Sequence, residues 1–393
     1  MNRQEQFRQG RMVLVTMLLG AGPALAQETF KPYVFTSYSH DNNFFRAADD
    51  AETNLITGSA QAGETVKKVG AGVKVDVPVS RQTFFGDVVM ERNWYEKFTG
   101  LNNTGAKAGA GWDWVVGSTF DGTVAYKYWK YLSTFDELQT PTKDMHTQQQ
   151  AVFVGGMKFL TDWHAVLELN RMEVKKDVRR ELDHRTSGYA GELQYLTAAN
   201  TYVGARYEAA QITYHHPLII GGIRNPDDGR ESTISLVAKW EGSSKSQLSA
   251  EVGRTHFDAA QTVNPDSTAA TGKFAYNWIV TSKLKVNTVL SRETETSDER
   301  AGYALTKGIE LTPAWQMTGK LSASLPLRHK NLDYKGNNAR SDTLNTLGAN
   351  LSYTPWRQVV LTASLTKENR DSSDANSAYH DQVYTLGAEY RFY

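Results

Sequence analysis

The 393-residue sequence contains no cysteine, so neither a disulfide framework nor a thiolate metal site can hold the fold together. It also carries no net charge, with 43 basic and 43 acidic residues. This balance argues against nucleic acid as a partner and against long-range attraction of a strongly anionic polymer. No apolar run beyond the first 20 residues is long enough to be a spanning helix, which excludes a helical membrane protein. A transmembrane barrel is not excluded, because its strands are only half apolar.

The first 26 residues have the pattern of a secretory signal. Three arginines precede the apolar run 12–20, and Ala24-Leu25-Ala26 forms a small-residue cleavage site. Gly20 and Pro23 end the apolar run too early for a membrane anchor. The sequence therefore predicts a cleaved signal peptide at 1–26 and a single domain at 27–393 in an oxidising compartment.

The remainder of the chain alternates apolar and polar residues with a period of two. Tight turns recur about every 40 residues, and longer polar loops separate them. The turns centre on Pro78-Ser80, Gly117-Thr119, Thr161-Asp162, Ala198-Asn200, Gly242-Ser244, Thr281-Ser282, Pro313-Ala314 and Thr354-Trp356. These eight turns and nine longer loops imply about 18 strands, an even number, with both chain ends on the turn side. A propeller or solenoid would repeat a sequence signature in each unit, and this chain shows none.

We therefore predict an all-β fold, a transmembrane antiparallel barrel of about 18 strands in the bacterial outer membrane, as a monomer or trimer. Unpaired charged side chains on the second face would strongly destabilise a packed core. Beside a water-filled lumen the same side chains stay hydrated and need no partner. The alternative is a large soluble sandwich or propeller with those charges on its outer surface.

Alternation assigns a set of polar and aromatic residues to the inward face as the predicted lumen and substrate path. This set comprises Glu91, Tyr95, Asp113, Lys127, Trp129, Lys158, Glu168, Glu192, Arg206, Glu208, Lys239, Glu251, Lys285, Glu368 and Arg370. The mixed signs do not suit selection of an anionic polymer or phosphate, which needs a surplus of one sign. Hydroxyls, amides and a few aromatic faces suit a neutral or weakly charged glycan. The alternative is that these residues form a generic hydrated surface, with charges paired across strands, and bind no particular substrate.

No catalytic or metal-binding constellation is evident. The adjacent His215 and His216 would point to opposite faces of a strand, and Asp227-Asp228-Gly229 lacks the regular oxygen ligands of a calcium loop. Neither a Gly-x-Ser-x-Gly nor a His-Glu-x-x-His motif occurs. We predict a non-enzymatic protein without a cofactor, although the dispersed residues of a barrel-embedded hydrolase would leave no such motif.

One predicted external loop, 215–230, contains an unusual apolar run. Leu218, Ile219, Ile220 and Ile223 should face water there, and exposed apolar groups of this kind normally pack against something. We predict that this segment folds into the barrel mouth as a gate. Packing on neighbouring loops or on another subunit is the alternative.

The last eleven residues form an alternating strand of the kind that closes an outer-membrane barrel. Tyr390 and Phe392 share one face, whereas Glu389 and Arg391 share the other. This strand should pair with the one near 33–40 and remove both sheet edges. Tyr390, Phe392 and Tyr393 are the predicted signal for the barrel-assembly machinery, with Tyr393 one residue beyond the usual end.

The segment YSHDNNFFR follows the first strand, and it resembles the signature of the EpsL-type family of outer-membrane barrels. The matching residues are Tyr38, Asp41, Asn43, Phe44, Phe45 and Arg46, with Asn42 in place of an acidic residue. The resemblance implies a role in exopolysaccharide biosynthesis and export, and it brings no catalytic residues. From the residues themselves, we expect Asp41 and Asn43 to cap the turn after the strand, and Phe44 and Phe45 to anchor it at the outer rim.

These observations predict an outer-membrane channel that passes an exopolysaccharide, supplied by separate periplasmic export components. Lipid of the outer membrane would surround it. The alternatives are a porin for uptake of small solutes or oligosaccharides, and a barrel that organises surface polysaccharide without conducting it.

Overall fold

The computed structural model describes residues 29–392 except 60, 136–139, 199–200, 217, 221–222, 226–227, 260–265, 297–302 and 336–338. The predicted signal peptide and Tyr393 therefore lie outside the described residues. Within them, no helix has the length and apolar character needed to cross a membrane. The elements are β1 (Phe30–Asp41), α2 (Asp50–Thr57), β2 (Glu64–Val79), β3 (Gln82–Tyr95), η2 (Thr99–Leu101), β4 (Asn103–Val116), β5 (Phe120–Leu132), β6 (Met145–Leu160), β7 (Trp163–Lys176), η3 (Arg180–Leu182), β8 (His184–Ala198), β9 (Thr201–Tyr214), β10 (Leu218–Ile220), β11 (Ile223–Asn225), β12 (Gly229–Ser243), β13 (Ser246–Ala259), β14 (Ser267–Ile279), β15 (Leu284–Thr296), β16 (Tyr303–Gln316), β17 (Leu321–Ser324), β18 (Leu327–Lys335), β19 (Arg340–Trp356), β20 (Val359–Ser372), η4 (Ala375–Ser377) and β21 (Tyr379–Arg391).

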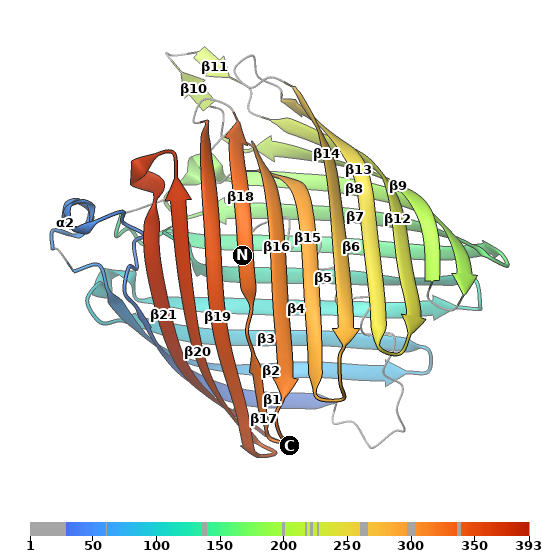
Figure 1. Ribbon diagram of the computed structural model, residues 1–393, viewed down its shortest axis with the longest axis horizontal. Helices are drawn as coiled ribbons and strands as arrows, with labels where there is room; N and C mark the ends of the chain where they lie inside the picture. Colours follow the sequence, from blue (N-terminus) through green and yellow to red (C-terminus); the bar gives the residue numbers. More distant parts are fainter. Residues whose placement is uncertain are drawn as a thin grey trace.

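The strands form one closed antiparallel barrel. Nineteen segments share a single sheet, and β17 and β18 are the two parts of one interrupted strand, so the barrel has 18 strands as predicted. It closes where β1 pairs with β21, with Tyr33 opposite Arg391 and Asp41 opposite Val383. In Figure 1 the strands at the front cross those at the back, because barrel strands tilt against the barrel axis.

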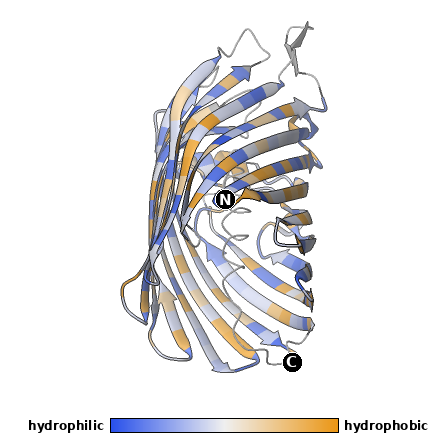
Figure 2. Cartoon of the chain, turned by 90° about the vertical axis from the view of Figure 1, so that its right-hand side faces the viewer, coloured by the Kyte–Doolittle hydropathy of each residue, from blue (hydrophilic) through white to orange (hydrophobic). Residues whose placement is uncertain are grey.

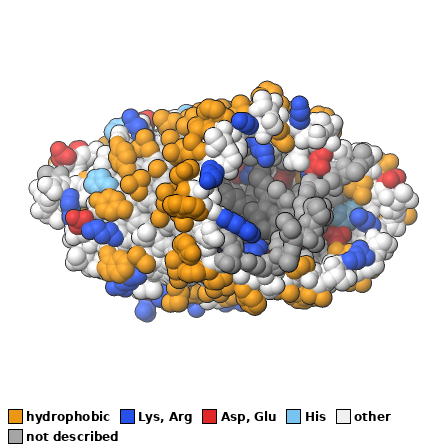
Figure 3. Space-filling view, turned by 90° about the horizontal axis from the view of Figure 1, so that it is seen from below, with side chains coloured by type: hydrophobic (Ala, Val, Ile, Leu, Met, Phe, Trp, Pro, Cys, Tyr) orange, Lys and Arg blue, Asp and Glu red, His pale blue; other side chains and the backbone are white. Residues whose placement is uncertain are grey.

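The two faces of the sheet differ in chemistry. Hydrophobic and hydrophilic residues alternate along the strands (Figure 2). Large apolar side chains such as Val88, Leu236 and Leu386 are exposed on the outer face, and hydrophobic side chains gather in a broad band on the surface seen in Figure 3. The charged side chains of the central strand segments lie on the opposite face, towards the lumen. An exposed apolar belt is costly in water and favourable in lipid, so the barrel is built to span a membrane.

The order of turns and loops agrees with the sequence except at two places. The predicted turn at Pro313-Ala314 is wrong, because both residues lie within β16 and the chain turns at 317–320. Pro313 is tolerated there because it lies beside the break between β17 and β18, where its carbonyl oxygen accepts a hydrogen bond from the Leu325 N–H (3.0 Å). The last turn likewise follows Trp356 instead of including it. We call the turn side of the barrel the turn end and the opposite side the loop end.

Two glycines on the lumen face of β2 make room for aromatic rings of β1. A Cβ at Gly70 would lie 2.4 Å from the Phe35 ring, and one at Gly72 would lie 2.6 Å from the Tyr33 ring. Both rings therefore lie over glycine backbone, flat along the wall of the barrel. Any larger side chain at either glycine would have to displace a ring into the lumen.

The closing strand has the predicted register. It ends at Arg391, with Phe392 next to Tyr390 on the outer face (ring centroids 4.9 Å apart) and Glu389 and Arg391 paired on the inner face (2.6 Å). Two outward aromatic side chains thus terminate the seam strand at the membrane surface.

Because Phe392 supplies this outward aromatic, deleting Tyr393 should leave assembly nearly intact, whereas deleting both terminal residues should abolish it. The heat-modifiable band in electrophoresis of outer-membrane fractions measures the folded barrel. Equal loss of that band in the two truncations would mean that Tyr393 is the terminal anchor.

Candidate functional site

The strand registers place all fifteen residues of the predicted lumen path on the inward face. Cross-strand pairing brings several of them together. Glu192 lies opposite Arg206, and Ala190 on β8 lies between Glu168 on β7 and Glu208 on β9. Others, such as Asp113, Lys158 and Lys285, stand apart from one another along the wall. Their part in solute passage stays a prediction.

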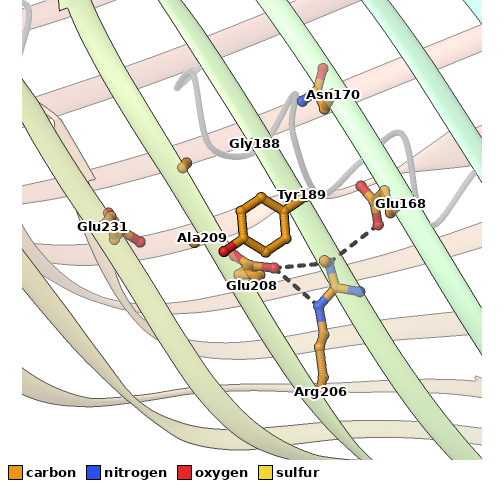
Figure 4. Close-up of a pocket in the computed structure, with 10 residues that line it drawn as sticks. Glu168, Asn170, Gly188, Tyr189, Arg206, Glu208, Ala209 and Glu231 are labelled. Carbon is orange, nitrogen blue, oxygen red and sulfur yellow. Dashed lines mark hydrogen bonds and ion pairs between the residues drawn. The ribbon is translucent and has the colours of Figure 1, made fainter.

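The densest inward cluster surrounds Arg206 near the middle of its strand. Its guanidinium group contacts the carboxylates of Glu208 (2.8 Å), Glu168 (3.2 Å) and Glu192 (3.4 Å), which come from β9, β7 and β8. Figure 4 shows the guanidinium group directed between Glu168 and Glu208. One guanidinium group thus contacts three carboxylates, which gathers acidic groups at this place in the channel wall.

Elsewhere several inward charges form ion pairs along the wall. Lys68 pairs with Glu91 (3.0 Å), and Arg328 pairs with Glu310 (2.8 Å), in each case across neighbouring strands. On β12, Lys239 pairs with Glu241 (2.8 Å). Such pairs hold their side chains against the sheet and leave the space between the walls to water and solute.

The two aromatic residues in the predicted path have different surroundings. Trp129 is half-buried on the inward face, with the Lys127 ammonium group 6.0 Å from its ring centre. Tyr95 also points inward, but it is buried beneath Phe44 (ring centroids 5.6 Å apart) and receives a hydrogen bond from Asn103 (3.4 Å). The prediction that Tyr95 offers an aromatic face to a glycan is therefore wrong, because a loop covers it.

The segment 38–46 fastens the first loop to the loop end of the seam strand. Asp41 caps the turn by accepting the Asn43 N–H (2.9 Å), as predicted, and also pairs with Arg46 (3.0 Å). Arg46 contacts Asp381 of β21 as well (3.1 Å). The Asn43 amide group donates to the carbonyl oxygens of Ala47 and His380, so the motif joins the first loop to the last strand.

Phe44 and Phe45 do not anchor the outer rim, and this prediction is wrong. Phe45 is 1% exposed and packs against Phe98 and Phe135, each with ring centroids 4.7 Å apart. Phe44 packs against the inward Tyr95. The first loop therefore folds to the lumen side of the wall, because rings from the neighbouring loops bury these side chains more completely than the membrane surface would.

Two buried carboxylates connect successive loops, and no sequence pattern pointed to either of them. Glu64 accepts hydrogen bonds from four backbone N–H groups, those of Thr65, Glu96, Lys97 and Phe98. Asp144 accepts the Val178 N–H (2.9 Å) and pairs with Arg179 (2.9 Å). We call the connected loop segments 42–59, 61–63, 96–102, 133–135, 140–144 and 177–183 the loop collar.

The predicted gate segment forms a small hairpin of its own. β10 pairs with β11, with Leu218 opposite Asn225 and Ile220 opposite Ile223. In Figure 1 this hairpin lies beyond the strand ends at the loop end, and it forms a sheet separate from the barrel. Its action as a gate stays a prediction. Across the part of the chain that the structure describes, no group of three His, Asp or Glu side chains is arranged to hold a metal ion.

Protonation of Asp144 should loosen the loop collar. Burial alone would raise the pKa of this carboxyl group, but the hydrogen bonds from Arg179 and the Val178 N–H outweigh it and lower the pKa. The carboxylate therefore stabilises the collar above about pH 4, and that stabilisation is lost as the pH falls through the lowered pKa. Asp144→Asn should cost about 2 kcal/mol at neutral pH.

Hydrogen exchange of residues 177–183 measures this effect. Protection relative to the intrinsic exchange rate at each pH should fall towards pH 3 in the wild-type barrel, and the Asn variant should show low protection at both pH values. Asp177→Asn, which changes a neighbouring loop carboxylate by the same charge, is the matched control. A variant whose exchange matches the wild type at neutral pH would contradict the assigned role.

Comparison with known proteins identifies similar barrels. A family described as "Putative beta-barrel porin 2" matches residues 247–392. The crystal structure of OccK5 (OpdH) from Pseudomonas aeruginosa is similar over 94% of this chain and all of that one, at 10% identity and a TM-score of 0.50. A BenF-like porin from Pseudomonas fluorescens Pf-5 is similar over 93% of this chain and 98% of that one, at 10% identity and a TM-score of 0.51. No curated protein sequence matches the chain.

The solved structures share the closed antiparallel architecture over nearly the whole chain, and the family match covers its C-terminal part. Together with the apolar belt, they identify an integral outer-membrane β-barrel with the fold of the porins.

Proposed function

We propose that this barrel is a channel for the uptake of small polar solutes across the outer membrane. The observation that carries the proposal is the inward face, on which charged groups pair along the wall and leave a polar interior for water and solute. The likeness to porin structures supports the same function.

The lining favours neutral and cationic solutes over anionic ones. Around Arg206, three carboxylates share one guanidinium group near the middle of the barrel. An anion entering this region would meet a group of three carboxylates, whereas a cation or a neutral hydroxylated solute would not be repelled by them. The loop collar supports small solutes in preference to a polymer, because its first loop lies on the lumen side of β3 at the loop end.

Export of an exopolysaccharide is supported less well than uptake. The expectation came from the motif at 38–46, whose residues hold the first loop to β21 and bury its phenylalanines. These contacts stabilise the fold and do not depend on which substrate passes through the barrel. The porin-type fold and the match to a porin family favour the uptake alternative.

Single-channel recording in planar bilayers tests the proposed channel. The purified barrel should conduct, with a reversal potential in a KCl gradient that shows cation preference. Arg206→Gln should increase that preference at least twofold, because three carboxylates then lack their shared cation. Arg328→Gln, which frees only Glu310, is the matched control and should shift the potential less. A barrel that does not conduct would overturn the proposed function.

Swelling of proteoliposomes separates uptake of small solutes from passage of a polymer. Monosaccharides and disaccharides should enter quickly, and rates should fall with solute size. Equal rates for disaccharides and long oligosaccharides would favour the exporter instead.

Deletion of 218–223 tests the predicted gate. If this hairpin gates the channel, its removal should raise the single-channel conductance without changing the ion preference. A shortened loop that leaves the conductance at the wild-type level would mean that the hairpin does not gate the channel.

A further inference from the structure

On many strands the outward face carries a cation where the apolar belt gives way to the loop end. Going from the turn end to the loop end on these strands, the first charged residue of the outward face is lysine or arginine, as at Arg92, Arg171 and Lys367. Apolar residues precede each of them, such as Met90 before Arg92 and Leu365 before Lys367. External loops mark the outer leaflet in barrels of this kind, so these cations lie at its headgroup level.

On this surface, the strands β13 to β18 form a groove of about 450 Å³. These strands lie side by side at the front of Figure 1. The outward side chains that line it are arranged in two cross-strand rows. The row nearer the turn end is apolar and consists of Phe274, Leu290 and Ile309, and the row nearer the loop end contains Arg292 and Lys307.

The two cations of this groove lie directly opposite each other. Arg292 and Lys307 are register partners on β15 and β16, and both side chains are exposed on the outward face. Like charges at directly opposed positions destabilise a sheet. Among the residues that the structure describes, no carboxylate forms an ion pair with either of them. Gly272, the register partner of Arg292 on β14, adds no outward side chain beside them.

Below the cations, the groove continues into the apolar belt. Phe274, Leu290 and Ile309 are 39%, 42% and 46% exposed, so their surfaces are open to lipid chains. His329 completes the floor of the groove, held by Asn345 through a 2.7 Å hydrogen bond. The groove thus places an anion-binding pair immediately above an apolar channel that runs towards the membrane centre.

We propose that this groove binds a phosphorylated lipid of the outer leaflet. Its phosphate group contacts Arg292 and Lys307, and an acyl chain lies along Phe274, Leu290 and Ile309. An anion between the two cations converts their repulsion into two charge-assisted contacts. The apolar row selects a lipid over a free phosphate, because only a lipid fills both halves of the groove.

Thermal unfolding of the delipidated full-length barrel in neutral detergent tests this site, with diphosphoryl lipid A as the probe. The double variant Arg292→Gln/Lys307→Gln should unfold at a higher temperature than the wild type without lipid, because the repulsion is gone. Added lipid A should raise the midpoint of the wild type and leave that of the variant nearly unchanged. Native mass spectrometry should show roughly tenfold weaker binding by the variant.

Arg92→Gln/Lys130→Gln removes the same charge from the outward face of β3 and β5, outside the groove, and should retain wild-type binding. If the double groove variant does not fold, Lys307→Gln alone provides the same comparison. Equal lipid binding by groove variant and wild type overturns the proposal. An equal loss of lipid A binding in the control variant overturns the proposal as well, because the binding would then come from the cations of the outer face in general and not from the groove. Inorganic pyrophosphate that stabilises the wild type as strongly as lipid A would show a free-anion site instead.

Discussion

The whole structure depends on one requirement, that every strand of a membrane-spanning sheet has a neighbour on both sides. Lipid offers no hydrogen-bond partner, so an open edge would leave a row of backbone groups unsatisfied. The pairing of β1 with β21 meets this requirement and fixes the register of Tyr33 opposite Arg391. That register determines which residues face lipid and which face the lumen, and the channel wall follows from it.

Closure also explains how the wall tolerates so many charges. Because each strand is fixed between two neighbours, Lys68 can meet Glu91 and Arg328 can meet Glu310 within hydrogen-bond distance without crossing the lumen. The cluster at Arg206 departs from this one-to-one pairing, and that departure gives the middle of the channel its electrostatic character. On the outer face one-to-one pairing of opposite charges is also absent, because the two cations Arg292 and Lys307 lie opposite each other.

Features with a short sequence period were predictable, and features that depend on distant contacts were not. Alternation was enough to place Glu168, Arg206 and Glu389 inward, and the spacing of turns was enough for the strand number. Pro313 was misassigned because its tolerance depends on a break in the neighbouring strand. Phe45 was misplaced because its partners, Phe98 and Phe135, come from other loops. The groove beside Arg292 required the register of three strands, which no single segment encodes.

The contacts of Asn43 have a consequence for the order of events during folding. Its side chain donates to the His380 carbonyl oxygen, a group 337 residues further along the chain. Asn42 likewise exchanges hydrogen bonds with Gln382. These bonds cannot form until the last strand has been synthesised and docked, although the motif itself emerges among the first residues. These long-range contacts therefore join the first loop to the last strand only once the barrel has closed.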